Sequence, residues 1–167
     1  MPLPSTPQEL AFHVDRHGVL AVPGVFWVGL LLLSRHWVLL LLVGLSSRRD
    51  GGQSAALLTG TAFSWVLMAG QTLALLVAAA ALRRLPDTGR WARWVWRYAP
   101  QLLLATAVIN AAALLPLIER WQHVDLWPHL FLASCTLLDA AVVVAVFKAP
   151  YYRQMFREFP ASPQPGQ

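Results

Sequence analysis

The sequence predicts an all-α membrane protein, a four-helix transmembrane bundle with a short interfacial amphipathic helix between the second and third spans. Three observations lead to this prediction. Hydrophobic residues make up 57% of the 167 residues, charged residues only 13%, and the mean hydropathy is +0.51, whereas a soluble domain of this size needs more surface charge. Four apolar stretches have the roughly 20 residues that cross a hydrocarbon core about 30 Å thick. The basic residues gather in the segments between these stretches.

The chain divides into three expected parts. Residues 1–18 form an N-terminal segment, residues 19–147 the transmembrane domain, and residues 148–167 an amphipathic and then disordered tail. The spans are expected at about 19–45, 55–82, 99–118 and 128–147. We expect no cleavable signal peptide, because prolines and polar residues occupy the positions before the first span. The first span should therefore remain as an uncleaved anchor.

The basic residues predict the orientation, because Lys and Arg in short loops favour the cytoplasm. The N-terminal segment, the loop 83–98 and the tail together hold nine Lys and Arg residues, and the two other loops hold three. Both termini are therefore expected to be cytoplasmic. The same count favours one continuous crossing by residues 19–45 over a re-entrant hairpin at Ser34–Trp37, because a hairpin would move the arginine-rich loop outside. Any distortion of this helix is expected at Ser34–His36.

Each span carries a polar residue near its centre. These residues lie at similar depth, within about one helical turn of the midplane: Arg35, Gln71, Asn110 and Asp139. A charged side chain at the centre of a membrane helix costs about 2.5–3.5 kcal/mol. We therefore predict an ion pair between the first and fourth spans, Arg35 with Asp139, in which the two amides satisfy the remaining donors and acceptors.

Two interpretations of this midplane polar layer remain open. In the first, the polar groups hold four helices together and fix their register. In the second, they line a path for a proton, an ion or a small polar solute, because ionisable residues inside a membrane are functional candidates. A pair of opposite charges neutralises itself, and four spans leave little room for a pore without oligomerisation. These two arguments favour the structural interpretation.

The segment between the second and third spans predicts the interfacial helix. Basic and apolar side chains alternate there at helical spacing, which suits aromatic rings at headgroup depth and guanidiniums on phosphates. The basic side holds Arg90, Arg93 and Arg97, and the other side holds Trp91, Trp94, Val95 and Tyr98. We interpret all of these except Val95 as interfacial anchors that contact anionic lipid headgroups. A docking site for a partner or for a specific acidic lipid is the alternative.

The tail repeats this pattern. Its apolar side chains are expected to face lipid and its basic ones, Arg153 and Arg157, to face water. The apolar set consists of Tyr151, Tyr152, Met155, Phe156 and Phe159.

No catalytic residue, cofactor or metal site is predicted. The single cysteine, Cys135, excludes an intramolecular disulfide and the paired-thiol chemistry of oxidoreductases. Two histidine segments, at residues 13–17 and 123–129, carry imidazole and carboxylate groups, but the predicted topology puts them on opposite sides of the membrane. We interpret both as interfacial polar segments. The net charge of +5 lies beside membrane spans, so nucleic acid is not an expected partner.

The first third of the chain resembles the YfeZ-type proteins, a family of small bacterial inner-membrane proteins. The resemblance depends on an acidic residue, a Gly-Val-Leu stretch, a Leu-rich run with an arginine and a tryptophan, and an Arg-Asp-Gly turn. The matching positions are Asp15, Gly18, Val19, Leu20, Pro23, Trp27, Arg35, Trp37, Arg49, Asp50 and Gly51. The family often has a proline between the arginine and the tryptophan, where this chain has His36. The resemblance implies a bacterial inner-membrane location and brings no catalytic residues.

The sequence thus predicts a non-enzymatic, multi-pass membrane protein that acts as an accessory or interaction subunit. Its expected partners are the lipid bilayer, anionic lipid headgroups, and a membrane-protein partner or a second copy of itself. The alternative is a small transporter or channel component, oligomeric, that uses the midplane polar layer.

Overall fold

The computed structural model describes residues 19–47, 65–85, 88–113 and 126–160. These residues form seven helices and no strand, which confirms the all-α class for this part of the chain. The helices are α2 (Gly24–Leu33), α3 (Arg35–Ser47), α5 (Trp65–Leu82), α6 (Arg90–Arg97), α7 (Ala99–Ala112), α9 (Leu126–Lys148) and α10 (Pro150–Arg157).

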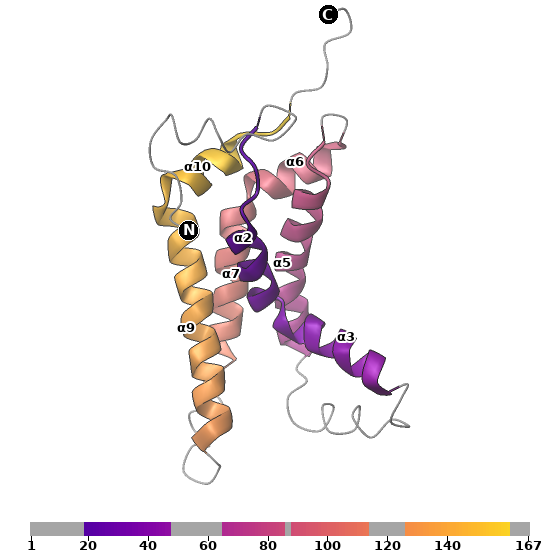
Figure 1. The fold of residues 1–167 in the computed structure, drawn as a ribbon, viewed down its shortest axis with the longest axis vertical. Coiled ribbons are helices and arrows are strands. Elements are labelled where there is room, and N and C mark those ends of the chain that lie inside the picture. Colours follow the sequence, from indigo (N-terminus) through magenta and orange to yellow (C-terminus); the bar gives the residue numbers. More distant parts are fainter. Residues whose placement is uncertain (1–18, 48–64, 86–87, 114–125, 161–167) are drawn as a thin grey trace, which may run out of the picture.

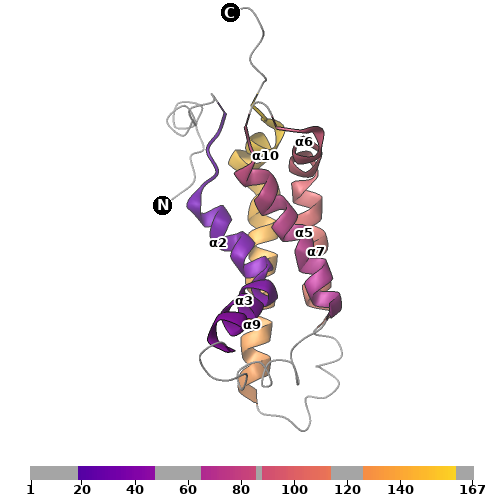
Figure 2. The ribbon, with the colours of Figure 1, turned by 90° about the vertical axis from the view of Figure 1, so that its right-hand side faces the viewer.

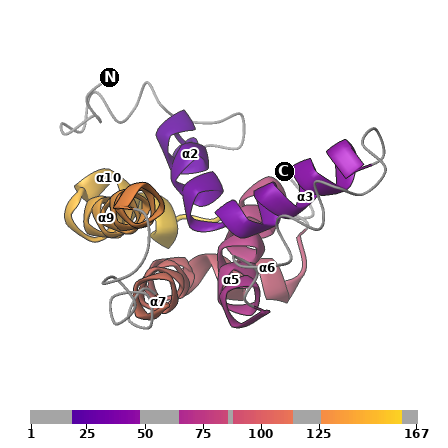
Figure 3. The ribbon, with the colours of Figure 1, turned by 90° about the horizontal axis from the view of Figure 1, so that it is seen from below.

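Four of these helices, α2, α5, α7 and α9, pack side by side (Figure 1). Viewed from below, they surround a common centre (Figure 3). The short helix α6 connects the end of α5 to the start of α7, and α10 follows the end of α9. Both short helices therefore lie across the same end of the bundle (Figures 1 and 2).

Two glycines allow close approach of neighbouring helices. A Cβ atom on Gly70 of α5 would lie 2.6 Å from the Ile109 side chain of α7, and one on Gly29 of α2 would lie 2.9 Å from the Val142 side chain of α9. A larger residue at either position would push the helices apart, so glycine is what allows this close packing.

The first predicted span is not one straight helix. It divides at Ser34 into α2 and α3, whose axes are bent by 77°, and α3 leaves the bundle sideways (Figure 3). Ser34 has φ −103° and ψ 22°, outside the helical range, and its hydroxyl donates to the Leu30 carbonyl at 2.7 Å. Such local side-chain bonds compete with the helix. The continuous helix expected over residues 19–45 is therefore not observed, and the distortion lies where it was expected.

Among the described residues, no single helix combines the length and hydropathy that a membrane crossing needs. Two bent pairs reach them jointly: Gly24–Leu33 with Arg35–Leu45, and Ala133–Lys148 with Pro150–Arg157, the latter bent by 71°. The four crossings expected from the sequence stay a prediction.

The apolar side of α10 packs against the bundle. Its four apolar side chains, Tyr151, Tyr152, Met155 and Phe156, are buried. The Phe156 ring lies 5.7 Å from the ring of Phe26 on α2 and 4.9 Å from that of Trp96 on α6. The expectation that these tail residues face lipid is wrong, because an amphipathic pattern is the same whether its apolar side meets lipid or protein.

Candidate functional site

Arg35, the first residue of α3, forms an ion pair with Asp139 near the middle of α9. The Arg35 Nη1 atom lies 2.6 Å from Asp139 Oδ2, and the two side chains are 13% and 0% exposed. The ion pair expected between these residues is thus present. A buried carboxylate would carry a desolvation cost of several kcal/mol, which the neighbouring guanidinium offsets.

The two predicted amides extend this pair into a network across the bundle. Asn110 on α7 donates to Asp139 Oδ2 at 2.9 Å, and Gln71 on α5 donates to Asn110 Oδ1, also at 2.9 Å. The same Gln71 nitrogen donates to Nδ1 of His36 at 2.7 Å, which requires that this imidazole nitrogen carries no proton. All four polar residues expected at similar depth are therefore joined. His36, which the sequence analysis did not include, is the fifth member.

The network also satisfies backbone groups that the helix break leaves open. Breaking a helix removes intrahelical partners from the carbonyls before the break and the N–H groups after it. Gln71 accepts a hydrogen bond from the His36 N–H at 2.9 Å. On the other side, Asn110 donates to the Leu33 carbonyl at 3.5 Å and Arg35 to the Leu32 carbonyl at 3.4 Å. The break and the polar network are thus one structural feature.

The chemistry of this network favours a fixed structure. Between His36 and Asp139 stand two amides, whose N–H protons are held by the nitrogen and do not transfer readily. One atom of the network differs from the rest: Oδ1 of Asp139 is buried and accepts no hydrogen bond from any described residue. No group of three or more His, Cys, Asp or Glu residues that could hold a metal occurs among the described residues.

The side chains of the histidine segments at residues 13–17 and 123–129 are outside the part of the chain that the structure describes.

A second charged region lies at the end of the bundle that α6 and α10 cover. Among the described residues, Arg35 and Asp139 are the charged residues within the length of the bundle, and all the others lie at this end (Figure 1). Those others are Arg83, Arg84, Arg90, Arg93, Arg97, Lys148, Arg153, Arg157 and Glu158.

Arg84 holds this end together. It is buried, donates to the Leu20 carbonyl and, at 3.0 Å, to the Glu158 carbonyl, and lies 5.0 Å from the Trp96 ring centre. The indole N–H of Trp96 donates to the Met155 carbonyl at 3.1 Å. These contacts fasten the segment before α2 to α10. In the sequence, Arg84 is only one of the charges of the loop 83–98, since no local pattern marks an arginine whose partners are distant carbonyls.

The same burial affects the phenols of α10. Desolvation raises the pKa of the Tyr152 hydroxyl above its ordinary value, because an ionised phenolate would lose its hydration there.

The predicted anchors of α6 remain exposed. All six are exposed: Arg90, Trp91, Arg93, Trp94, Arg97 and Tyr98. The side of α6 that packs on the bundle consists instead of Ala92, Val95 and Trp96, so Val95 does not share the side of the exposed rings. Trp96 was missed because it stands between positions assigned to the two sides. Whether the exposed anchors contact lipid stays a prediction.

The described helices thus hold a largely buried polar network and an arginine-rich end. No catalytic group of side chains is recognisable among the described residues. No curated protein and no solved structure matches the chain. A family profile described as "Protein of unknown function (DUF2919)" matches residues 11–158. Because the match covers most of the 167 residues, the chain belongs to the DUF2919 family.

Proposed function

We propose that this protein is a non-enzymatic integral protein of the bacterial inner membrane, with both termini in the cytoplasm, and that it acts as an accessory or interaction subunit. One observation carries the proposal: the described helices expose apolar side chains along the length of the bundle, while the charged pair within that length, Arg35 with Asp139, is turned inward and largely buried. Val66 is 73% and Leu137 72% exposed. Contact of such an apolar surface with lipid carries no free-energy cost, whereas its exposure to water is unfavourable.

The resemblance to the YfeZ-type proteins supports the choice of membrane. The exposed rings of Trp91, Trp94 and Tyr98 lie at the charged end, where an aromatic belt would meet the headgroups. The broken helix supports it too, because interrupted helices are tolerated in a bilayer where neighbouring side chains satisfy the freed backbone groups.

The interaction role is supported by α3. This helix leaves the bundle and exposes five leucines: Leu39, Leu40, Leu41, Leu42 and Leu45. In the described residues its main contacts are with α2 and α5, in addition to the ion pair of Arg35 with Asp139 on α9. An apolar arm of this kind is suited to pack on a neighbouring membrane protein.

The membrane location is tested by alkaline carbonate extraction and by labelling of single cysteines in a Cys135→Ser background. The protein should stay in the carbonate pellet. Arg153→Cys should react with an impermeant maleimide only after the inner membrane is permeabilised, and Leu137→Cys should remain unlabelled as the lipid-facing control. Release by carbonate, or labelling of Arg153→Cys in cells whose inner membrane is intact, would contradict the proposal.

The interaction role is tested with a photoreactive residue at position 41 on α3. The matched control carries the same residue at Leu137, which is also exposed but lies on α9. We expect one discrete protein adduct from position 41, identified by mass spectrometry, and none from position 137. Lipid adducts alone at both positions would count against an interaction subunit.

A second candidate is a small oligomeric transporter or channel component, favoured by Oδ1 of Asp139. This atom is buried beside a broken helix and accepts no hydrogen bond from any described residue, as expected for a group that takes up a proton or a cation. Proteoliposomes test it. A cation or proton flux that Asp139→Asn abolishes would establish transport, and the absence of flux with correctly oriented protein would leave the accessory role.

A further inference from the structure

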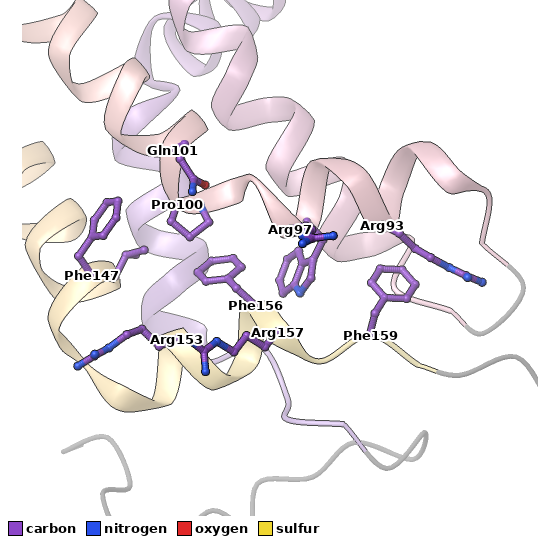
Figure 4. A pocket seen from close by; sticks show the side chains of 11 residues that line it. Arg93, Arg97, Pro100, Gln101, Phe147, Arg153, Phe156, Arg157 and Phe159 are labelled. Atoms are coloured by element: carbon purple, nitrogen blue, oxygen red, sulfur yellow. The ribbon is translucent and has the colours of Figure 1, made fainter.

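The arginine-rich end contains a pocket between α6 and α10 (Figure 4). Its volume is about 570 Å³. Four arginines line it, two from each helix: Arg93 and Arg97 on α6, Arg153 and Arg157 on α10. Each pair stands four residues apart, so that both members lie on one side of their helix. The pocket is therefore flanked by positive charge on both sides.

No acidic residue lines the pocket within the part of the chain that the structure describes. The one described carboxylate at this end, that of Glu158, accepts hydrogen bonds from the Leu20 N–H at 3.1 Å and from the Gln154 amide at 2.9 Å. Neither Arg97 nor Arg157 has an acidic partner within the described residues. The like charges of Arg97 and Arg157 beside a shared space repel one another, and an anion between them would remove that repulsion.

The floor of the pocket is apolar and aromatic. Trp96 and Phe156 are buried, with ring centres 4.9 Å apart. On the side of α9, the pocket continues over Val146 and the exposed Phe147 (Figure 4). Above Phe147, the outer surface of the bundle is apolar, with Val144 exposed. Cationic walls over an apolar floor that opens toward an apolar flank suit a ligand with a phosphate head and a hydrocarbon tail.

We propose that this pocket binds the phosphate group of an anionic phospholipid, with the guanidiniums of Arg97 and Arg157 as the principal contacts. Because Arg97 and Arg157 come from different helices (Figure 4), each can hold one phosphate, which favours a lipid with two linked phosphates over a lipid with one. Guanidinium binds phosphate bidentately, which lysine does not, so charge alone is not sufficient at these positions. The acyl chains would extend over Phe147 along the flank of α9.

This inference rests on the proposed membrane location for the source of the lipid. Its test uses the purified full-length protein in detergent, so failure here leaves the carbonate result unaffected. Native mass spectrometry would measure binding of diphosphatidylglycerol, phosphatidylglycerol and phosphatidylcholine, with inorganic pyrophosphate as the soluble competitor.

We expect diphosphatidylglycerol to bind more tightly than phosphatidylglycerol, and phosphatidylcholine not to bind specifically. The double variant Arg97→Gln/Arg157→Gln should weaken binding at least tenfold, and Arg97→Lys/Arg157→Lys should recover only part of the loss. Arg83→Gln, which removes an exposed charge from the same end of the bundle but outside the pocket, is the matched control and should bind as the unchanged protein does.

Three results would overturn the proposal. Equal binding by the double glutamine variant would remove the pocket as the site. An equal loss in Arg83→Gln would show diffuse attraction to charge. Full displacement of lipid by equimolar pyrophosphate would make a soluble phosphate compound the ligand. Because Arg97 and Arg157 are exposed, the variants should fold, and unchanged melting temperatures would verify this.

Discussion

Arginine serves two opposite purposes in this molecule. At the break between α2 and α3, Arg35 is 13% exposed and pairs with a fully buried carboxylate at 2.6 Å. In the pocket between α6 and α10, by contrast, Arg97 and Arg157 are exposed, and no acidic residue of the described part of the chain lines this pocket. The difference lies in desolvation: a charge inside the bundle needs a fixed partner, whereas an exposed charge keeps its hydration and remains available for a ligand. Stability should therefore depend on the first region and ligand binding on the second.

The largest effect is expected from Asp139→Leu, which leaves Arg35 without its counter-charge. Removing one partner of a buried ion pair costs about 3–5 kcal/mol, a large fraction of the free energy of unfolding of an ordinary protein. Unfolding in mixed SDS micelles would measure this loss. Asp139→Asn keeps the shape of the side chain and one acceptor, so its loss of stability should be smaller. If Asp139→Leu is as stable as the unchanged protein, the comparison of the two regions is contradicted.

A smaller but still large effect is expected from Gln71→Leu. Gln71 is fully buried and bonds to the His36 N–H, the His36 ring and Asn110. Its removal leaves the His36 N–H, a fixed backbone donor, without its acceptor, at a cost of about 1–3 kcal/mol. Because the His36 N–H lies in the first turn of α3, loss of its acceptor should also loosen the bend at Ser34. Hydrogen exchange at residues 35–38 should then be faster. Thr72→Val, one residue along the same helix, is the control.

Overpacking should have a moderate effect. A side chain on Gly70 meets Ile109 at 2.6 Å, so Gly70→Leu should separate α5 from α7 and cost about 1–3 kcal/mol. Gly44 on α3 has open space around it, and Gly44→Leu should be neutral or slightly stabilising because it improves helix propensity. Similar destabilisation by both variants, measured in the same SDS titration, would argue against the close packing of α5 on α7.

The smallest effect on stability is expected at the pocket. Arg97→Gln/Arg157→Gln should change the free energy of unfolding by less than about 0.5 kcal/mol, as exposed substitutions do, while it weakens lipid binding. A large loss of stability without lipid present would show that these arginines hold α10 in place, and the contrast between the two regions would fail.

The sequence predicted the central contact of the first region for a physical reason. A charge in an apolar helix needs a partner, and Asp139 is the acidic residue nearest the middle of another apolar stretch. The size of the bend at Ser34 could not be predicted, because the Leu-rich run contains no proline or glycine at that point. His36 joined the network only because the bend turns its backbone toward Gln71.

The second region was predicted only in part. The arginine and tryptophan spacing gave α6 and its exposed anchors, but not the pocket, which exists because α10 folds back across the end of the bundle. Amphipathicity alone does not distinguish a lipid surface from a protein one. Arg84 was missed for a related reason, since its partners are carbonyls of residues 20 and 158, far away in the sequence.

A double-mutant cycle on Arg35 and Asp139 tests the central claim most directly, namely that the polar network is a structural joint between the helices. The cycle compares Arg35→Met, Asp139→Leu and the double variant in mixed SDS micelles. We predict that each single variant loses about 3–5 kcal/mol and that the double variant recovers more than about 2 kcal/mol of the summed loss. If the loss of the double variant equals the sum of the two single losses in free energy of unfolding, the account is contradicted.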